Sequence, residues 1–397
     1  MGPLEGIRIL DFTWALAGPF GTMILADMGA EVWKIEPAAM TEEERGPGPM
    51  AHGFNIYFFS VNRGKDSIAL DLKQDEGRAL ALSLAEHADV LTENFSPGTM
   101  ASLGLGYDAV SARNPRIIYA STSGFGQTGP DAARGAVDVI VQAMSGLMSI
   151  TGFPDGPPAR VGYSIADMAA GMFTAIGVLG ALVERGRSGR GQYLDVSMLD
   201  CQIALLEGAI TRYLATGVPP GRIGTRHPLI TPFQAFATAD GDIVVANVKD
   251  WTLFCALLGL DELALDPRFA TNELRTQHHA ELEPLLAAAF AREPAAHWLR
   301  ELAPACLVAP VNTIPQAVQE PQVRHREMLV DVPAGAERMT VVNSPLKYSR
   351  TPVRVARGAD PAGGHTRAVL REVLGLGDDD LRRLEEAGVI GAARLPG

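Results

Sequence analysis

The sequence predicts an α/β protein with a large domain built on a parallel, doubly wound sheet and a smaller α+β domain. Two observations lead to this fold class. Apolar, strand-like runs alternate with helical patterns over the first 120 residues, and such alternation is typical of parallel sheets. A stretch rich in Gly and Pro at 217–232 then precedes a hairpin pattern, which indicates a second unit.

Five short apolar runs are the predicted strands of the large domain. They are residues 7–12 (IRILDF), 30–36 (AEVWKIE), 66–72 (DSIALDL), 88–95 (ADVLTENF) and 116–126 (RIIYASTSGFG). Helical patterns at 18–28, 75–86 and 98–113 lie between them, which gives a Rossmann-like start. The dinucleotide fingerprint GxGxxG is absent after the first strand, where the chain reads DFTWALAGPFGT, so NAD binding has no motif.

Residues 165–183 (IADMAAGMFTAIGVLGALV) form a run long and apolar enough to raise a membrane-spanning reading. Asp167 stands in its first turn, three glycines interrupt it, and the charged segment ERGRSGRGQ follows. We therefore expect a buried core helix and no membrane association. The segment after it, ending in QYLDVS, predicts a turn and a short strand.

The smaller domain begins with residues 233–247, which predict a hairpin with Asp240 and Gly241 at its turn. Helical patterns follow through the 250s and from the 280s to the 300s. We place the large domain at 1–214 plus 326–397, a linker at 215–224 and the small domain at 225–325. A strand-like run at 339–349 and a helical tail at 365–390 complete the large domain.

Composition and charge narrow the function classes. The 397 residues carry a formal charge of −12, are 47% apolar, and contain no basic stripe, so we expect an ordered globular protein that does not bind nucleic acid. The three cysteines form no paired or CxxC pattern and no secretory signal is apparent, which favours a cytoplasmic location. We find no GxxxxGK[ST], HExxH or GxSxG motif, and expect no metal site.

Ser164 and Asp167 head the long apolar helix with the spacing of a capping box, in which each side chain satisfies a backbone N–H at the helix start. The same position has a second interpretation. A carboxylate in the first turn lies at the positive end of the helix dipole and can act as a nucleophile. Spacing alone does not decide between a cap and a catalyst.

Residues 162–200 (GYSIADMAAGMFTAIGVLGALVERGRSGRGQYLDVSMLD) resemble a signature block of the class III CoA-transferases, the CaiB/BaiF or formyl-CoA-transferase-like family. Further stretches that resemble the family are 3–36, 62–78, 88–110, 117–130, 137–158 and 363–390, so the resemblance covers nearly the whole chain. It implies that Asp167 attacks an acyl-CoA thioester and that an aspartyl-CoA thioester forms. Acyl-CoA and a small carboxylic acid are then the substrates, with succinyl-CoA or another dicarboxylyl-CoA as candidate donors, and no tightly bound cofactor is expected.

The resemblance also implies where coenzyme A binds. The implied contacts lie in four segments, many of them through backbone groups: Leu16 and Ala17; Leu70, Asp71, Leu72 and Lys73; Asn94, Phe95 and Ser96; Arg134, Gly135, Ala136 and Val137. Pro37 and Ser102 stand where some relatives carry arginines, so Arg63 or Arg134 is a candidate replacement for the phosphates. Lys65 is a further candidate, although we expect it to be a solvated surface lysine.

Two other functions stay open. Racemases of the same superfamily, which act on 2-methylacyl-CoA, carry a proton-transferring histidine at the position of Val137, and valine cannot carry a proton. This favours transfer over racemisation or epimerisation. A CoA-binding protein that has lost the chemistry is the third reading, against which the retained Asp167 block argues.

Residues next to the linker are weaker candidates. Gly221 and Gly224 correspond either to a loop that closes over the site in some relatives or to a flexible linker, and Arg226 and His227 are candidates for binding the acceptor carboxylate. By resemblance, the assembly is an interlocked homodimer of ring-like subunits whose large domain contains both chain termini.

Overall fold

The computed structural model describes residues 2–392 and divides into two compact units. The first unit contains the chain up to Leu147, Val161–Ala215 and the chain from Gln322. The second unit contains Met148–Arg160 and Thr216–Pro321. The short segment 148–160 thus belongs to the second unit, whereas the sequence-based division assigned it to the large domain.

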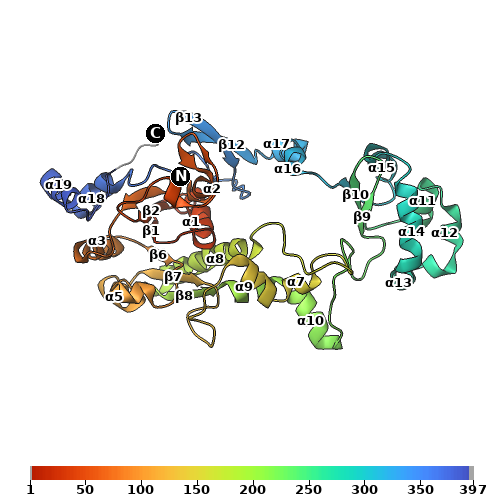
Figure 1. Ribbon diagram of the computed structural model, residues 1–397, viewed down its shortest axis with the longest axis horizontal. Coiled ribbons are helices and arrows are strands. Elements are labelled where there is room, and N and C mark those ends of the chain that lie inside the picture. The colour runs from red at the N-terminus through yellow and green to blue at the C-terminus, as the bar shows by residue number, and fades with distance from the viewer. Residues whose placement is uncertain (1, 393–397) are drawn as a thin grey trace. The chain divides into compact units, whose positions relative to one another are not determined.

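Six parallel strands form the central sheet of the first unit, in the order β5-β2-β1-β6-β7-β8 (Figure 1). Their bounds are β1 Arg8–Asp11, β2 Glu31–Glu36, β5 Asp66–Ala69, β6 Val90–Glu93, β7 Ile118–Ser123 and β8 Tyr193–Ser197. All five predicted strands and the short strand after the long helix are confirmed. The direction of winding reverses between β1 and β6, and ligands of such sheets bind beyond the carboxyl ends of the strands at this point.

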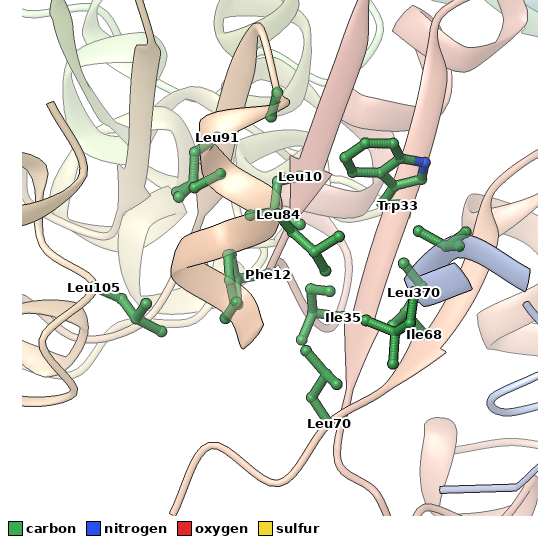
Figure 2. Packing of buried hydrophobic residues seen from close by; sticks show 14 of the residues in the cluster. Leu10, Phe12, Trp33, Ile35, Ile68, Leu70, Leu84, Leu91, Leu105 and Leu370 are labelled. Atoms are coloured by element: carbon green, nitrogen blue, oxygen red, sulfur yellow. The ribbon is translucent and has the colours of Figure 1, made fainter. Parts of the chain in front are cut away.

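Successive strand residues face opposite sides of the sheet, so each side has its own core. On one side Leu10, Trp33 and Leu91 pack against Leu84 and Leu370, which come from α3 (Asp75–Glu86) and α18 (Thr366–Leu374) (Figure 2). On the other side the strand neighbours of these residues pack against α1 (Ala17–Asp27) and α8 (Ile165–Ser188): Ile9, Val32 and Val90.

Helices α1 and α8 approach closely because two glycines face each other. A Cβ atom on Gly171 would lie 2.6 Å from the carbonyl oxygen of Ala17, and one on Gly21 would lie 2.8 Å from the carbonyl oxygen of Gly171. Neither position accepts a side chain without separating the helices. This contact fixes the first turns of α8 beside the loop that follows β1.

Among the described residues, α8 is long enough and apolar enough to cross a membrane, judged by length and composition alone. A single such helix is weak support for a membrane protein, since core helices of soluble proteins meet the same criterion. Only one face of α8 is buried, against α1 and the sheet, while Met172, Phe173, Ile176 and Val183 are exposed. The prediction of a buried core helix holds for that one face.

The C-terminal part of the chain closes the outer edge of the sheet beside β5. The backbone N–H of His365 donates to Ser67 O at 2.9 Å, and Leu70 forms a bridge with Ile390. The remaining elements of the first unit are η1 Glu43–Arg45, β3 Met50–Ala51, β4 Phe54–Asn55, α2 Ile56–Asn62, α4 Thr99–Ser102, α5 Tyr107–Arg113, α6 Asp138–Met144, α9 Met198–Leu205, α10 Glu207–Thr216, α17 Pro321–His325, β12 Leu329–Ala334, β13 Glu337–Val342 and α19 Asp378–Glu386.

The second unit contains a three-stranded antiparallel sheet in the order β11-β10-β9, with helices packed against it. The predicted hairpin is confirmed as β9 Gln234–Ala237 and β10 Asp242–Ala246, with the turn at Asp240 and Gly241. The other elements are α7 Leu147–Ile150, α11 Trp251–Leu257, α12 Asp261–Leu265, η2 Pro267–Phe269, α13 Asn272–Gln277, α14 His279–Phe290, α15 Ala295–Glu301, β11 Leu307–Pro310 and α16 Ile314–Ala317.

Candidate active site

Asp167 lies in the first turn of α8, as the sequence predicts, but the capping box does not form. The Ser164 side chain makes no capping hydrogen bond. Instead, Asp138 of α6 caps α8 from outside, because its Oδ1 accepts the backbone N–H of Ala166 at 2.9 Å. The capping interpretation of Asp167 was therefore wrong, and its carboxylate is not engaged at the helix start.

Asp138 is itself held by Gln142, one turn further along α6. The Gln142 Nε2 atom donates to Asp138 Oδ2 at 2.7 Å, and Gln142 Oε1 accepts the backbone N–H of Val161 at 2.9 Å. Gln142 is fully buried and Asp138 is 6% exposed. This network joins α6, the segment entering α8 and the first turn of α8 into one rigid support beneath Asp167.

The electrostatic surroundings of Asp167 favour its protonated form. Burial raises the pKa of Asp167 to about 7, and the negative charge of Asp138 acts in the same direction. Tyr57 of α2 interacts electrostatically with Asp167, since burial, then the charge of Asp167 and then Tyr163 raise the pKa of the Tyr57 phenol to about 12. A carboxyl group with a pKa near neutrality and a phenol that stays protonated thus share one site, and perturbed groups of this kind mark functional sites.

The reversal point of the sheet holds two of the four implied coenzyme A segments together. Trp14, in the loop after β1, donates its backbone N–H to Asn94 Oδ1 at 2.8 Å, and Asn94 Nδ2 donates to Trp14 O at 2.9 Å. Ala15 follows with φ of 58°, a left-handed conformation that is uncommon for alanine. Leu16 and Ala17 come next, at the start of α1, and Phe95 and Ser96 follow Asn94.

The segment Leu70–Lys73 leaves the same carboxyl edge, after β5. Leu70 is 1% exposed and belongs to the core, while the Asp71 carboxylate accepts the backbone N–H of Lys73 at 3.0 Å. The Lys73 side chain is exposed. Lys73 is therefore the one charged side chain of this segment that is available to a ligand, because Asp71 is occupied by its own turn and by Gln74.

The fourth implied segment, Arg134–Val137, leads into α6 and so into Asp138. Gly124, at the end of β7, lets this segment approach, since a Cβ atom there would lie 2.1 Å from the Cβ atom of Ala136. Val137 is 61% exposed. The Arg134 guanidinium is half-exposed and lies 3.9 Å from Asp131, which leaves it accessible to an anion.

Two predictions about cations were wrong. Lys65 is 2% exposed, and its Nζ donates to Asp11, Pro19 O and Asn62 at 3.1, 3.0 and 2.8 Å. It is a buried structural residue because Asp11, at the end of β1, needs a counter-ion in the interior. Burial lowers the pKa of Lys65 to about 7 against the opposing effect of Asp11.

Arg63 is likewise unavailable to coenzyme A. It is 4% exposed, and its Nη2 donates to Asp27 at 2.6 Å. Burial of both side chains makes this ion pair part of the support for α1. Neither Lys65 nor Arg63 can hold the phosphates, which leaves Lys73 and Arg134 of the candidates.

Comparison with known proteins identifies the chain. The family model described as CoA-transferase family III matches residues 4–366. The chain belongs to CoA-transferase family III. The family that the sequence resembled is thereby confirmed, and with it the expectation that the protein is an enzyme that transfers coenzyme A.

Individual relatives agree with this assignment. The chain is 46% identical to the acetyl-CoA:oxalate CoA-transferase of Acetobacter aceti over 83% of this chain and 86% of the relative. It is 39% identical to the succinyl-CoA:glutarate CoA-transferase of Mus musculus over 98% of this chain and 91% of the relative. Among solved structures, a CaiB/BaiF family protein from Brucella suis matches with a TM-score of 0.85 and 35% identity, covering 94% of this chain and 99% of that chain.

The four weaker candidates of this family III enzyme lie in the second unit. The backbone N–H of Gly224, which has a φ of 67°, donates to Gly152 O at 2.9 Å. Arg226 makes no ion pair within the described residues, its Nε is buried without a partner, and burial lowers its pKa against the opposing effect of Glu283. His227 packs against the Phe233 ring at 5.1 Å, and Gly221 is exposed.

Sequence reasoning missed Asp138, Gln142 and Tyr57. Asp138 starts a helix, where an acidic residue is common, so nothing in the local pattern points to a contact with α8. Tyr57 lies in α2, a short helix that no pattern predicted. A signal was present only for Asp138, in its position directly after the implied segment Arg134–Val137.

A group of possible metal ligands lies elsewhere in the first unit. Ligand atoms of Asp66, Asp360 and His365 lie within 4.8 Å of one another. However, Arg357 Nη2 donates to Asp66 Oδ1 at 2.6 Å and to Asp360 Oδ2 at 2.8 Å. The guanidinium already supplies a positive charge between the two carboxylates, so these residues form an ion-pair network.

Proposed function

We propose that this enzyme exchanges coenzyme A between a small acyl-CoA, including dicarboxylyl thioesters such as succinyl-CoA, and a free carboxylic acid, with Asp167 as the nucleophile. The observation that carries the proposal is the unengaged carboxylate of Asp167, held at the start of α8 by the Asp138 cap. The relatives named above act on oxalate and on succinyl and glutaryl groups, which supports acids with two carboxylates.

The proposed reaction proceeds through four acyl transfers, two with the donor and two with the acceptor. An Asp167 carboxylate oxygen attacks the thioester carbonyl carbon, the C–S bond breaks, and coenzyme A leaves as the thiolate with the bonding electrons. The thiolate then attacks Cγ of Asp167 in the mixed anhydride, which releases the donor acid as its carboxylate. An aspartyl-CoA thioester remains, and the acceptor carboxylate reverses the same steps.

The surrounding residues suit these steps. Asp167 must be ionised to attack, and its raised pKa makes the carboxylate more basic and thus more nucleophilic. The phenol of Tyr57 keeps its proton at neutral pH, so it can donate a hydrogen bond to oxygen atoms that gain negative charge. The positive end of α8 acts in the same direction.

Coenzyme A is proposed to bind at the carboxyl edge of the central sheet. The loops after β1 and β6, joined by Trp14 and Asn94, form the reversal point where ligands of such sheets bind. Lys73 and Arg134 are the proposed phosphate partners, because their side chains are exposed there while Lys65 and Arg63 are occupied. The exchange of one thioester for another requires no metal and no tightly bound cofactor.

Trapping of the aspartyl thioester tests the proposal. Incubation with succinyl-CoA followed by proteolysis and mass spectrometry should place coenzyme A on Asp167, and hydroxylamine should convert the adduct to a hydroxamate. Asp167→Asn should abolish both adduct and exchange. Asp261→Asn serves as the matched control, since Asp261 is an exposed first-turn aspartate of α12 in the other unit.

The same preparation discriminates the two other readings. Exchange in deuterated water should leave the acyl α-carbon without deuterium, whereas a racemase or epimerase must introduce it. Val137 supports this expectation because its side chain cannot carry a proton. Acyl-CoA binding without turnover across a panel of acids would instead favour a CoA-binding protein that lacks catalysis.

We further propose that the enzyme is a cytoplasmic homodimer. Exposed apolar side chains gather on three helices of the first unit, and a second copy would cover such a surface. They are Val139, Ile140 and Met144 of α6, Met172, Phe173, Ile176 and Val183 of α8, and Ile203 and Leu205 of α9. The three cysteines are all free and buried, which suits a reducing compartment. Sedimentation of a monomer at micromolar concentration would contradict the dimer.

A further inference from the structure

The second unit contains a pocket of about 350 Å³ between the end of β10 and the start of α13. Its lining includes two cationic side chains, Arg275 and Lys249, and two amides, Asn247 and Asn272. None of the seven lining residues carries a carboxylate. A volume of this size lies in the range of small-molecule sites, and its lining suits an anion.

Arg275 is the buried cation of this pocket. It is 8% exposed, its Nε donates to Thr231 O at 2.9 Å and its Nη1 donates to Phe269 O at 3.0 Å. The guanidinium also stacks on the Trp251 ring at 4.6 Å. These contacts fix its orientation but supply no negative charge, and Nη2 has no hydrogen-bond partner among residues 2–392.

The lack of a counter-ion at Arg275 is unusual for a buried charge, because removing a cation from water costs free energy unless an anion accompanies it. Burial lowers the pKa of Arg275, and Cys255 and Glu273 only act against that effect from a distance. Arg275 makes no ion pair with the described residues, and its hydrogen bonds go to backbone carbonyl oxygens. Arg275 is therefore a buried cation without an anionic partner in the described chain.

Lys249 and Asn247 also line the pocket. The Lys249 side chain is exposed and has no hydrogen bond or ion pair to the described residues. Asn247 adopts a left-handed conformation with φ of 49°, which asparagine tolerates better than most non-glycine residues. Its amide is likewise exposed and without a partner in the described chain.

Asn272 holds the loop 229–231, which also lines the pocket. Its Oδ1 accepts the backbone N–H of Thr231 at 3.0 Å, and its Nδ2 donates to Leu229 O at 2.8 Å. The loop that carries Ile230 is therefore fixed before any ligand arrives. Ile230 and Val248 add apolar surface between the polar groups, which suits the methylene chain of an organic anion and is of no use to phosphate.

We propose that this pocket binds a small dicarboxylate anion, with one carboxylate on Nη2 of Arg275 and the other near Lys249 and the Asn247 amide. The site consists only of residues of the second unit, so it is a binding site for the free acid in addition to the chemistry proposed for Asp167. Its ligand belongs to the class of acids that an enzyme of this family exchanges.

Hydrogen–deuterium exchange with mass spectrometry tests this proposal without turnover, on the full chain with Asp167→Asn and no acyl-CoA. Titration with glutarate should protect peptides that cover 244–254 and 268–278. Lys249→Met should raise the glutarate concentration at half-maximal protection about tenfold, as expected for loss of a charged hydrogen bond. Lys347→Met, which alters an exposed lysine of the first unit, should leave the midpoint unchanged.

Asn247→Gly guards against a folding artefact, because glycine accepts the left-handed backbone and removes only the amide. It should keep the thermal stability of the parent and weaken binding roughly threefold to tenfold. Equal protection by inorganic phosphate at matched ionic strength would overturn the dicarboxylate assignment. Absence of protection with glutarate, or the same midpoint in Lys249→Met, would overturn the site.

Discussion

Asp138 has two opposing effects on Asp167: it positions the helix turn that carries Asp167, and it disfavours the ionised form of Asp167. Its Oδ1 accepts the N–H of Ala166 at 2.9 Å, which fixes the first turn of the helix that carries Asp167. Its negative charge, together with the larger effect of burial, raises the pKa of Asp167 to about 7. The residue that positions the nucleophile therefore also limits the pH range in which the nucleophile is ionised.

The rate of exchange should consequently depend on pH near neutrality. Because Asp167 attacks only as the carboxylate and its pKa is raised, activity should be low at pH 5.5 and rise through a midpoint of about 7. Single-turnover formation of the aspartyl thioester measures this, since substrates whose carboxyl groups ionise below pH 5 do not contribute. A rate that is constant from pH 5.5 to 7.5 would show that Asp167 is already ionised throughout.

Asp138→Asn separates the two roles of Asp138. The asparagine Oδ1 can still accept the N–H of Ala166 while the negative charge is gone, and its Nδ2 replaces the oxygen that accepts Gln142 Nε2, so this second hydrogen bond is lost. The pKa of Asp167 should fall, so the midpoint of the pH–rate profile should move to lower pH. Asp138→Ala removes the cap as well and should lower the plateau rate by roughly tenfold or more through loss of positioning. Identical profiles for the wild type and Asp138→Asn would refute the electrostatic role.

Much of this arrangement could be predicted from the sequence. The strands were visible because the sheet is buried on both faces, so residues such as Ile9 and Leu10 form continuous apolar runs. Asp167 was placed correctly because its helix is long and strongly apolar. Buried strands and long apolar helices depend on local composition and can therefore be predicted from the sequence.

The errors concern contacts between residues far apart in the chain. Lys65 was expected at the surface because its neighbours are polar, but its counter-ion Asp11 lies 54 residues earlier. Ser164 has the right spacing for a cap but makes no capping hydrogen bond, and the helix start is capped instead at Ala166 by Asp138, 28 residues earlier. Local spacing carries no information about which distant carboxylate or ammonium group will be brought alongside.

Asn94→Leu should disconnect the two loops at the reversal point. The variant loses both hydrogen bonds to the Trp14 backbone, so the loop that precedes Leu16 and Ala17 should become mobile. We expect the KM for acyl-CoA to rise about tenfold, with a loss of about 1–3 kcal/mol in unfolding free energy. Steady-state kinetics and urea denaturation measure the two effects.

Asn114 provides the control for this variant, since its Nδ2 donates to Ala85 O at 3.0 Å and to Ala88 O at 2.8 Å, also bridging two segments. Asn114→Leu should lower stability to a similar extent and leave the KM for acyl-CoA unchanged. An equal rise in KM for both variants would mean that Asn94 acts only through general stability.

Gly171→Ala tests the close approach of α1 and α8. The new Cβ atom would lie 2.6 Å from the carbonyl oxygen of Ala17, and backbone cannot move aside as a flexible side chain can. The helices must separate, which should lower the unfolding free energy by about 1–3 kcal/mol and displace Asp167, one turn away, so that kcat falls as well. Gly180→Ala on the same helix meets nothing within 4 Å and should raise stability by about 0.5–1 kcal/mol through helix propensity. Thermal unfolding and CoA-exchange assays on the two variants measure these effects. If Gly171→Ala left both stability and kcat unchanged, α1 and α8 would not be held at this distance in solution.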